Sequence, residues 1–183
     1  LLVQALSTAG LVDTVRNSDD ITVFAPTDAA FTQLAVDLGF EGDQTDETAV
    51  FDFIVASLTT LGNGDPVPLL TDILLYHVSA GAKTQAEVEA ETSIDTLLTG
   101  ATIAPANGEL GDNEPDLANP TIAVPDVTGV NGIIRGIDRV LLPIDVPGNT
   151  NIVDIALASD DFNILVQALS TAGLVDTVRD SDD

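Results

Sequence analysis

The chain contains the same 19-residue segment twice, at residues 2–20 and again at residues 165–183. The two copies differ only at Asn17, whose counterpart is Asp180, and they begin 163 residues apart. That offset is far longer than the roughly 20–50 residues of a solenoid repeat, and it is typical of a whole domain. The sequence therefore predicts domain-sized units that are repeated almost without change.

The repeat also sets the expected domain boundaries. We expect a first domain over residues 1–147 and the start of the next unit over residues 148–183, joined by a linker rich in Pro and Gly. Residues 149–163 (NTNIVDIALASDDFN) precede the second copy and have no counterpart before the first. The first domain is therefore expected to lack its first helix. Residues 148–183 are expected to supply that helix, either to this domain or to a neighbour in a domain-swapped homo-oligomer, with a frayed tail as the alternative.

Helical patterns dominate the first half of the chain. Apolar residues recur at helical spacing, and the spacing of Thr84 and Glu87 is that of a capping box. We expect helices at residues 2–9, 11–16, 28–36, 50–61 and 69–77, and a short one from residue 84. A strand at residues 21–25, an acidic loop at 39–47 and a turn at 62–68 lie between them.

Strand patterns follow the helices. Strands are expected at residues 101–104, 121–124 and 133–142, with a long loop over residues 105–120. Helices first and strands afterwards favour an α+β fold over alternating βαβ units. Aromatic residues make up only 4% of the chain while apolar residues make up 45%, so we expect an aliphatic core.

The charge of the chain is one-sided. It has 30 acidic and 5 basic residues and a formal net charge of −25. Such a surface repels phosphate, which excludes nucleic acid as a partner, and its self-repulsion favours salty surroundings; solubility alone is the other explanation. The chain has no cysteine, which excludes disulfides and a thiolate zinc site. Charges interrupt the apolar runs, so we expect no membrane span in this stretch of chain.

Three segments resemble the fasciclin-like (FAS1) domain family, in the family's order. They are TVFAPTDAAF at residues 22–31, LLYHV at residues 74–78 and NGIIRGIDRVLLP at residues 131–143. The resemblance spans essentially the whole chain and implies a wedge of β-strands beside a layer of helices. It also implies a secreted, extracellular or cell-surface protein of cell–cell or cell–matrix adhesion. Arg135 and Gly136 depart from the second signature, which often has a histidine and a bulky apolar residue there.

The resemblance also selects candidate residues for binding or for the integrity of the fold. They are Tyr76, His77, Thr27, Asp28 and Asp138. Thr27 is placed to cap the helix that follows it. We predict that Tyr76 and His77 pin their helix to the sheet through Asp138 or Thr22.

Catalysis by histidine would have to use His77, because it is the only histidine. His77 follows Leu70 and Leu74 on an apolar helical stripe, where a buried, hydrogen-bonded histidine is the commoner use. The chain also has neither a G-x-S-x-G elbow nor a phosphate-cradling glycine loop. The sequence therefore predicts that this protein is not an enzyme.

Two acidic clusters are the candidates for a metal site. They contain Glu41, Asp43, Asp46 and Glu47 in the first, and Glu109, Asp112, Glu114 and Asp116 in the second. Calcium needs about six to eight oxygen ligands, but neither cluster has the EF-hand pattern. Because charge runs are usually solvated, the sequence favours solvated loops, with weak calcium screening between repeats as the alternative. No other cofactor is expected.

Arg135 and Arg139 flank Asp138 in a chain with few cations. We expect them to pair internally with Asp138 or a neighbouring acid, rather than to bind a partner.

The repetition itself suggests the function. Linked copies gain multivalency, which raises apparent affinity without a better single site. We therefore predict an extracellular adhesion or surface-attachment module that acts on cell-surface or matrix proteins or polysaccharides and on adjacent repeats. A passive spacer in a large adhesin and a small-ligand or glycan-binding module are the alternatives, although the chain has no Trp and only one Tyr on which a sugar could stack.

Overall fold

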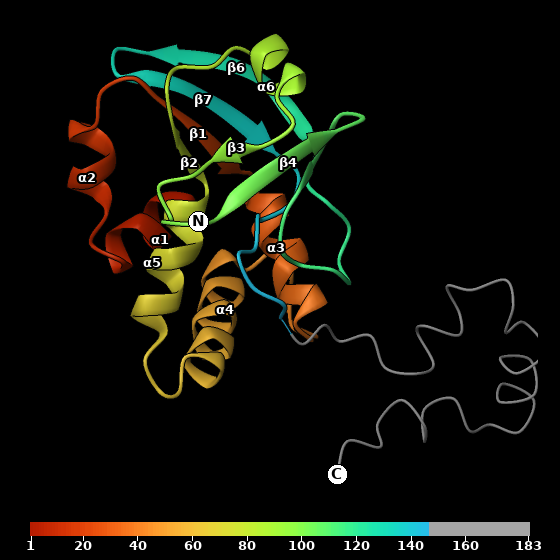
Figure 1. The fold of residues 1–183 in the computed structure, drawn as a ribbon. Coiled ribbons are helices and arrows are strands. Elements are labelled where there is room, and N and C mark those ends of the chain that lie inside the picture. Colours follow the sequence, from red (N-terminus) through yellow and green to blue (C-terminus); the bar gives the residue numbers. More distant parts are fainter. Residues whose placement is uncertain (147–183) are drawn as a thin grey trace, which may run out of the picture. The chain divides into compact units, whose positions relative to one another are not determined.

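The computed structural model describes residues 1–146, which belong to a single unit, Leu1–Pro147. The predictions about residues 148–183, including the missing helix and the domain swap, lie outside the described residues. The described part has six helices and seven strands, and Figure 1 shows how they are arranged. The helices are α1 (Leu2–Thr8), α2 (Val12–Asn17), α3 (Asp28–Asp37), α4 (Glu47–Leu61), α5 (Pro66–Tyr76) and α6 (Gln85–Ala90). The strands are β1 (Ile21–Pro26), β2 (Val78–Ala80), β3 (Ile94–Asp95), β4 (Thr102–Ala106), β5 (Glu109–Gly111), β6 (Ile122–Gly129) and β7 (Gly132–Ile137).

Side-chain caps start the larger helices. Thr27 caps α3, Asp46 caps α4 and Asp65 caps α5, each by accepting a backbone N–H that the first turn leaves free. The cap at Asp65 and the proline at the start of α5 explain why this helix begins at Pro66, ahead of the expected residue 69. Thr84 and Glu87 form the predicted capping box of α6.

Two sheets hold the strands. The larger has the order β2-β1-β7-β6, and the smaller has the order β3-β4-β5. Strand β1 pairs in parallel with β7, from Ile21 opposite Gly132 to Pro26 opposite Ile137, while the other pairs are antiparallel. The combination of a helical layer with mixed sheets confirms the α+β class.

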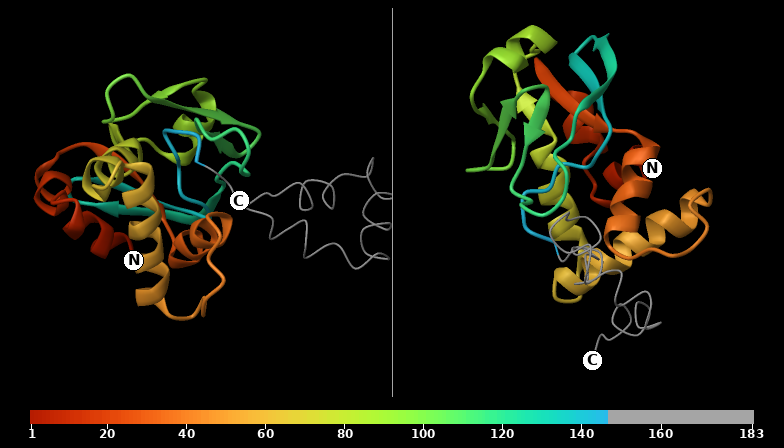
Figure 2. Two further views of the ribbon diagram at one scale, coloured as in Figure 1. Left: turned by 90° about the horizontal axis from the view of Figure 1, so that it is seen from below. Right: turned by 90° about the vertical axis from the view of Figure 1, so that its right-hand side faces the viewer.

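The buried apolar residues form two clusters. One fills the helical layer and includes Phe31, Val50 and Ile54. The other lies between the two sheets, α5 and α6 and includes Phe24 and Ile103. Figure 2 shows the same division, with α3 and α4 at one end of this unit and the strands at the other. The side chains between the sheets therefore connect to the helical layer through α5.

The strand boundaries differ from those predicted. β5 lies inside the expected loop, because Asn107 and Gly108 adopt positive φ and close a tight turn after β4. Strand β7 ends at Ile137 rather than at residue 142, because the backbone N–H groups of Leu141 and Leu142 donate to side chains instead of to a neighbouring strand. No helix in residues 1–146 is long and apolar enough to cross a membrane.

Candidate functional site

The Tyr76–His77 pair lies where the helical layer meets the strands. His77 is buried, its Nδ1 lies 2.7 Å from the carbonyl oxygen of Ile73, and its Nε2 accepts the N–H of Leu141 at 3.0 Å. Since Nε2 accepts, Nδ1 carries the proton and donates it to Ile73. The ring therefore joins the end of α5 to the segment that follows β7.

Burial lowers the pKa of His77 to about 4, because an apolar surrounding disfavours the charged ring. Both ring nitrogens are bonded to backbone groups, so neither is free to exchange a proton with a substrate. The geometry makes His77 a structural cross-link.

Tyr76 makes a second cross-link from the same helix end. Its hydroxyl donates to the carbonyl oxygen of Thr102 in β4 at 2.7 Å, and burial raises the pKa of the phenol. Together the two side chains tie α5 to the smaller sheet and to the chain beyond β7. The hydrogen bonds thus link the helix to the strands through other partners than the predicted Asp138 and Thr22.

Asp138 and Thr22, the partners expected from the sequence, bond elsewhere. Asp138 accepts both the N–H and the hydroxyl of Thr121, each at 2.6 Å, and so holds the start of β6. Thr22 donates its hydroxyl to the carbonyl oxygen of Gly81. The prediction was wrong because His77 is satisfied by backbone groups, which a sequence does not distinguish from one another.

Thr27 and Asp28 lie at the start of α3. The Thr27 hydroxyl accepts the N–H of Ala30 at 3.2 Å, as predicted for a cap. The Asp28 carboxylate faces solvent and accepts from the amino group of Leu1 at 3.0 Å. These two residues are separate from the Tyr76–His77 cross-links, so the five candidates do not form one site.

Arg135 is buried and bonded internally. Its guanidinium donates to both carboxylate oxygens of Asp126, at 2.8 and 3.0 Å, and to the carbonyl oxygen of Lys83, and it lies over the Phe24 ring. This bonding lowers the pKa of Asp126. Internal pairing was therefore correct for Arg135, but its partner is Asp126 and not Asp138.

Arg139 pairs with Asp37 of α3 at 3.0 Å. Asp126 comes from the neighbouring strand and Asp37 from a distant helix, so proximity in the sequence could not identify either partner.

The first acidic cluster works locally. Asp43 accepts the N–H and the hydroxyl of Thr45, and Asp46 caps α4. Glu47 lies in the first turn of α4, and Glu41 is exposed. These carboxylates order a loop and a helix start, which is the usual role of acidic side chains at such positions.

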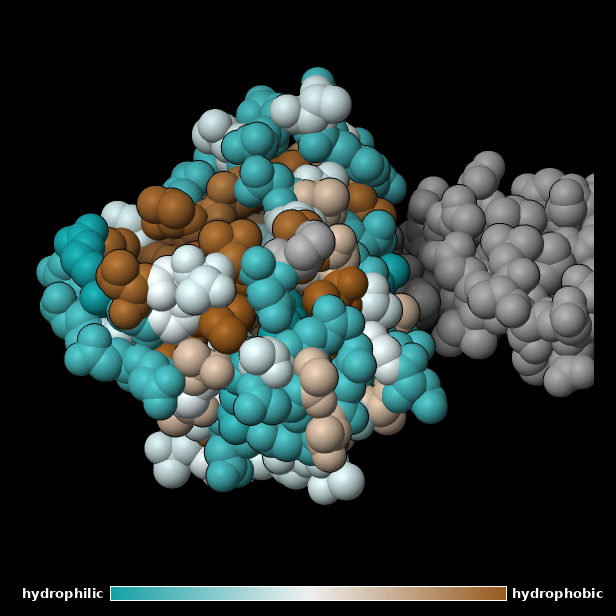
Figure 3. Space-filling view, turned by 90° about the horizontal axis from the view of Figure 1, so that it is seen from above, coloured by the Kyte–Doolittle hydropathy of each residue, from teal (hydrophilic) through white to brown (hydrophobic). Residues whose placement is uncertain are grey.

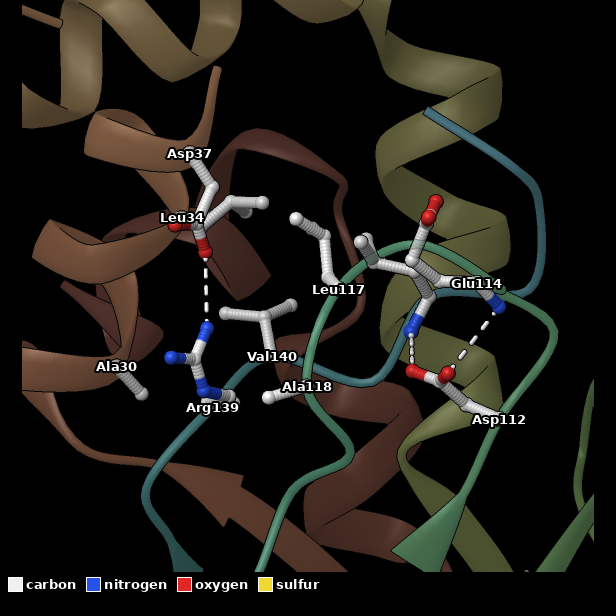
Figure 4. A pocket seen from close by; sticks show the side chains of 10 residues that line it. Ala30, Leu34, Asp37, Asp112, Glu114, Leu117, Ala118, Arg139 and Val140 are labelled. Atoms are coloured by element: carbon white, nitrogen blue, oxygen red, sulfur yellow. Dashed lines mark hydrogen bonds and ion pairs between the residues drawn. The ribbon is translucent and has the colours of Figure 1, made fainter. Parts of the chain in front are cut away.

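The second acidic cluster holds the end of the described chain. Asp112 accepts the N–H groups of Glu114 and Leu142, and Glu114 accepts those of Asp116 and Val146. Burial raises the pKa of Asp112 to about 6. Figure 4 shows Asp112 facing these backbone groups on one side of a small cavity, with the Arg139–Asp37 pair on the other. The cavity has a volume of about 10 Å³, which fits about one water molecule.

Part of the second cluster is a candidate metal centre. Carboxylate oxygens of Glu114, Asp116 and Asp145 lie within 4.8 Å of one another. The sequence named the first two but missed Asp145, which follows the last described strand. Glu109 and Asp112 lie outside this trio, and both oxygens of Glu114 already accept N–H groups. The three carboxylates alone supply fewer oxygen ligands than the roughly six to eight that calcium takes.

A larger hollow lies between α6 and the β4–β5 hairpin. It has a volume of about 310 Å³. Its apolar lining residues are Val88, Pro105, Ala106, Leu110 and Ile122, of which Val88 and Leu110 are almost fully buried. Glu89 and Glu109 also line it. Sequence reasoning missed this hollow because its walls come from α6, the β4–β5 hairpin and the start of β6, which only the fold brings together.

Known proteins resemble this chain over most of the described residues. A family model described as the fasciclin domain matches residues 1–143. The uncharacterized protein sll1735 of Synechocystis sp. is 35% identical over 142 residues, which are 77% of this chain and 86% of that protein. Protein sll1483 of the same organism is 31% identical over 142 residues, covering 78% of this chain and 66% of that protein. Among solved structures, a FAS1 domain pair from the insect cell adhesion molecule fasciclin I has a TM-score of 0.49 and 13% identity; the match covers 98% of this chain and 55% of the pair.

Proposed function

This chain belongs to the fasciclin domain family, and on that premise we propose that it is a non-catalytic adhesion module that attaches its parent protein to surfaces outside the cell. Its partners in this proposal are proteins or polysaccharides of a cell surface or matrix. The observation that carries the proposal is the repeat, in which residues 2–20 and 165–183 differ at a single position. Domains that are copied this closely would present the same binding surface. Linking such domains can raise the apparent affinity about 10²- to 10⁴-fold.

The bonding of His77 supports the non-catalytic part of the proposal. It is the only histidine of the chain, and its two nitrogens hold backbone groups of α5 and of the segment after β7. A general acid or base must reach a substrate proton directly or through one water. Because both nitrogens of the His77 ring are bonded to backbone groups, the ring does not reach a substrate proton.

The charge of the chain supports a place of action in salty surroundings. A net charge of −25 keeps repeated domains apart at low ionic strength, and screening within about 10 Å at 0.1 M salt weakens that repulsion. Attachment to an acidic polysaccharide or envelope would then depend on salt or on a bridging cation. The acidic loops around Asp43 and Asp116 are where calcium would act in such a bridge.

Retention on candidate surfaces tests the proposal. This chain and a chain of four repeats are passed over bacterial envelopes and over acidic and neutral polysaccharides in high salt, with and without calcium. A monomeric acidic protein of similar charge serves as the control. Retention of the four-repeat chain that is at least tenfold stronger supports a multivalent adhesion module, and its loss on chelation assigns calcium a bridging role. Failure of both chains to be retained better than the control contradicts the proposal and favours a passive spacer.

The hollow between α6 and the β4–β5 hairpin favours a second candidate, a module that binds a small ligand. Its apolar lining next to Glu89 and Glu109 suits a compact ligand with an apolar body and a positive charge. An alkylammonium compound should raise the melting temperature of the native chain and should do so less in Glu109→Gln. The absence of any shift at millimolar concentration contradicts this second candidate.

A further inference from the structure

The outer face of the four-stranded sheet carries two rows of apolar residues. Val23, Ile134 and Val127 form one row across β1, β7 and β6, since Ile134 is the register partner of both valines. Ala25, Gly136 and Val124 form the second row in the same way. Because side chains alternate along a strand, these rows face away from the buried Phe24 and Arg135. We call this surface, together with Val130 in the turn after β6, the apolar sheet face.

A bulge in β6 creates this arrangement. The register shifts between Val124 and Val127, so both valines occupy the outer face, where strict alternation would have placed Val124 and Asp126. Asp126 bonds instead to Arg135. Because of the bulge, the outer face carries the apolar Val127 in place of the charged Asp126.

The apolar sheet face is exposed. The exposed fractions are 41% for Val124, 57% for Val127, 47% for Ile134 and 108% for Val130. Figure 3 shows apolar side chains gathered in a band on the side seen from above, where β6 and β7 lie in Figure 1. Within this mixed sheet β6 and β7 form an antiparallel pair, and antiparallel strands with one face in water normally present polar residues there. Contiguous exposed apolar patches, by contrast, mark interaction sites.

The same face carries no net charge in a chain of net charge −25. Between residues 121 and 137 the charged side chains are Asp126 and Arg135, and they pair with each other. A cationic partner is drawn to the acidic surfaces elsewhere and gains nothing here. Two copies of this polyanionic domain, by contrast, repel each other least when they approach through a neutral face.

The β6 edge of the sheet is interrupted and so is poorly suited to simple strand addition. β6 is the last strand of the order, and an edge strand can recruit another chain through its free backbone groups. Pro125 has no N–H to donate, and the register shifts interrupt the ladder. At this side of the sheet a partner is therefore expected on the face rather than along β6.

We propose that the apolar sheet face is an interface with a second copy of this domain, in which two sheets pack face to face as in a β-sandwich. The same patch on both partners gives a closed two-fold contact, and the valine and isoleucine rows of the two sheets interdigitate. The 19 residues that recur at 165–183 predict a further copy of this domain in the parent chain, and linked copies would meet at a high effective concentration. This interface goes beyond the proposed attachment function and does not depend on it, because it needs no foreign surface.

Sedimentation equilibrium of the native chain tests the interface in solution, at 0.1 and 1 M salt over a wide concentration range. We expect a reversible dimer that tightens at high salt, because screening weakens repulsion while apolar burial persists. The double variant Val127→Thr/Ile134→Thr keeps β-branched side chains and should weaken the dimer at least tenfold. The control Val67→Thr replaces an exposed valine on α5 and should leave it unchanged. Circular dichroism and melting curves verify that each variant is folded.

Three results overturn the proposal. The first is a chain that stays monomeric at high concentration in 1 M salt. The second is a dimer of the same strength in the double variant, which would place the contact elsewhere, for example in a domain swap. The third is a monomer whose retention on envelopes is lost in the double variant, which would give the face to a foreign apolar partner. If the double variant is retained on envelopes as strongly as the native chain, attachment does not use this face. The interface and the attachment function can therefore fail separately.

Discussion

Acid should destabilise this protein through His77, since the fold holds its ring in the neutral form. Nδ1–H donates to the carbonyl of Ile73 and Nε2 accepts the N–H of Leu141. Protonation of Nε2 would set two donors against each other in a buried site. Because the folded-state pKa is depressed to about 4 from 6.5, the stabilisation is complete above pH 6.5 and is lost as the pH falls through 4.

The magnitude follows from the size of the shift. One pKa unit corresponds to about 1.4 kcal/mol, so the full effect approaches about 3 kcal/mol, of which about 2 kcal/mol is lost between pH 7 and pH 5. Asp112 acts in the opposite direction. Burial raises its pKa to about 6, so its contribution to stability is present at low pH and is lost as the pH rises through 6. The pH dependence of the native protein alone therefore does not isolate His77.

A matched variant isolates it. His77→Gln does not titrate and keeps an acceptor that can reach the N–H of Leu141, while every carboxyl group stays the same in both proteins. We expect the variant to be less stable by about 1–3 kcal/mol at pH 7. Urea unfolding at pH 7, 6 and 5 should show this difference shrinking by about 2 kcal/mol.

A difference that stays constant with pH would refute the reasoning. Because the chain has one histidine, the ring can also be titrated by NMR in the unaltered protein, whether or not the variant folds. A pKa near 6.5 in the folded state would contradict the assigned bonding.

Three further perturbations test other contacts. Tyr76→Phe leaves a buried carbonyl of β4 without its donor and should cost about 1–3 kcal/mol in urea unfolding; an unchanged midpoint would show that water replaces the hydroxyl. Asp126→Asn leaves the buried Arg135 charge without its carboxylate and should cost about 2–4 kcal/mol, a loss that 1 M salt does not restore; full recovery in salt would contradict a buried pair. Gly136→Ala places a Cβ 2.5 Å from the Cβ and 2.7 Å from the Cγ2 of Val124 and should cost about 1–3 kcal/mol by overpacking. Adding Val124→Ala removes the Cγ2 contact but keeps the Cβ, so it should recover part of the loss; no recovery would mean that the Cβ contact or another one limits the site.

Local signals determined much of the architecture. The apolar periodicity of residues 50–61 predicted α4 from residues within one or two helical turns of each other. The caps at Thr27 and Thr84 were likewise predicted from neighbours three residues away, because a cap bonds the N–H groups of its own first turn. The order of helices and strands and the three signature segments were enough for the α+β class and the family.

Contacts between distant segments were decided only by the tertiary structure. The parallel pairing of β1 with β7 joins residues more than a hundred positions apart, and it brings Leu141 to His77. The bulge in β6 places Asp126 on the side of the sheet where Arg135 lies, so Asp126 and not Asp138 is the partner of Arg135. Many donors and acceptors in a sequence suit a given buried polar group equally well. Which of them lies within 3 Å of it depends on how the sheets and helices pack, and that packing is a property of the whole chain.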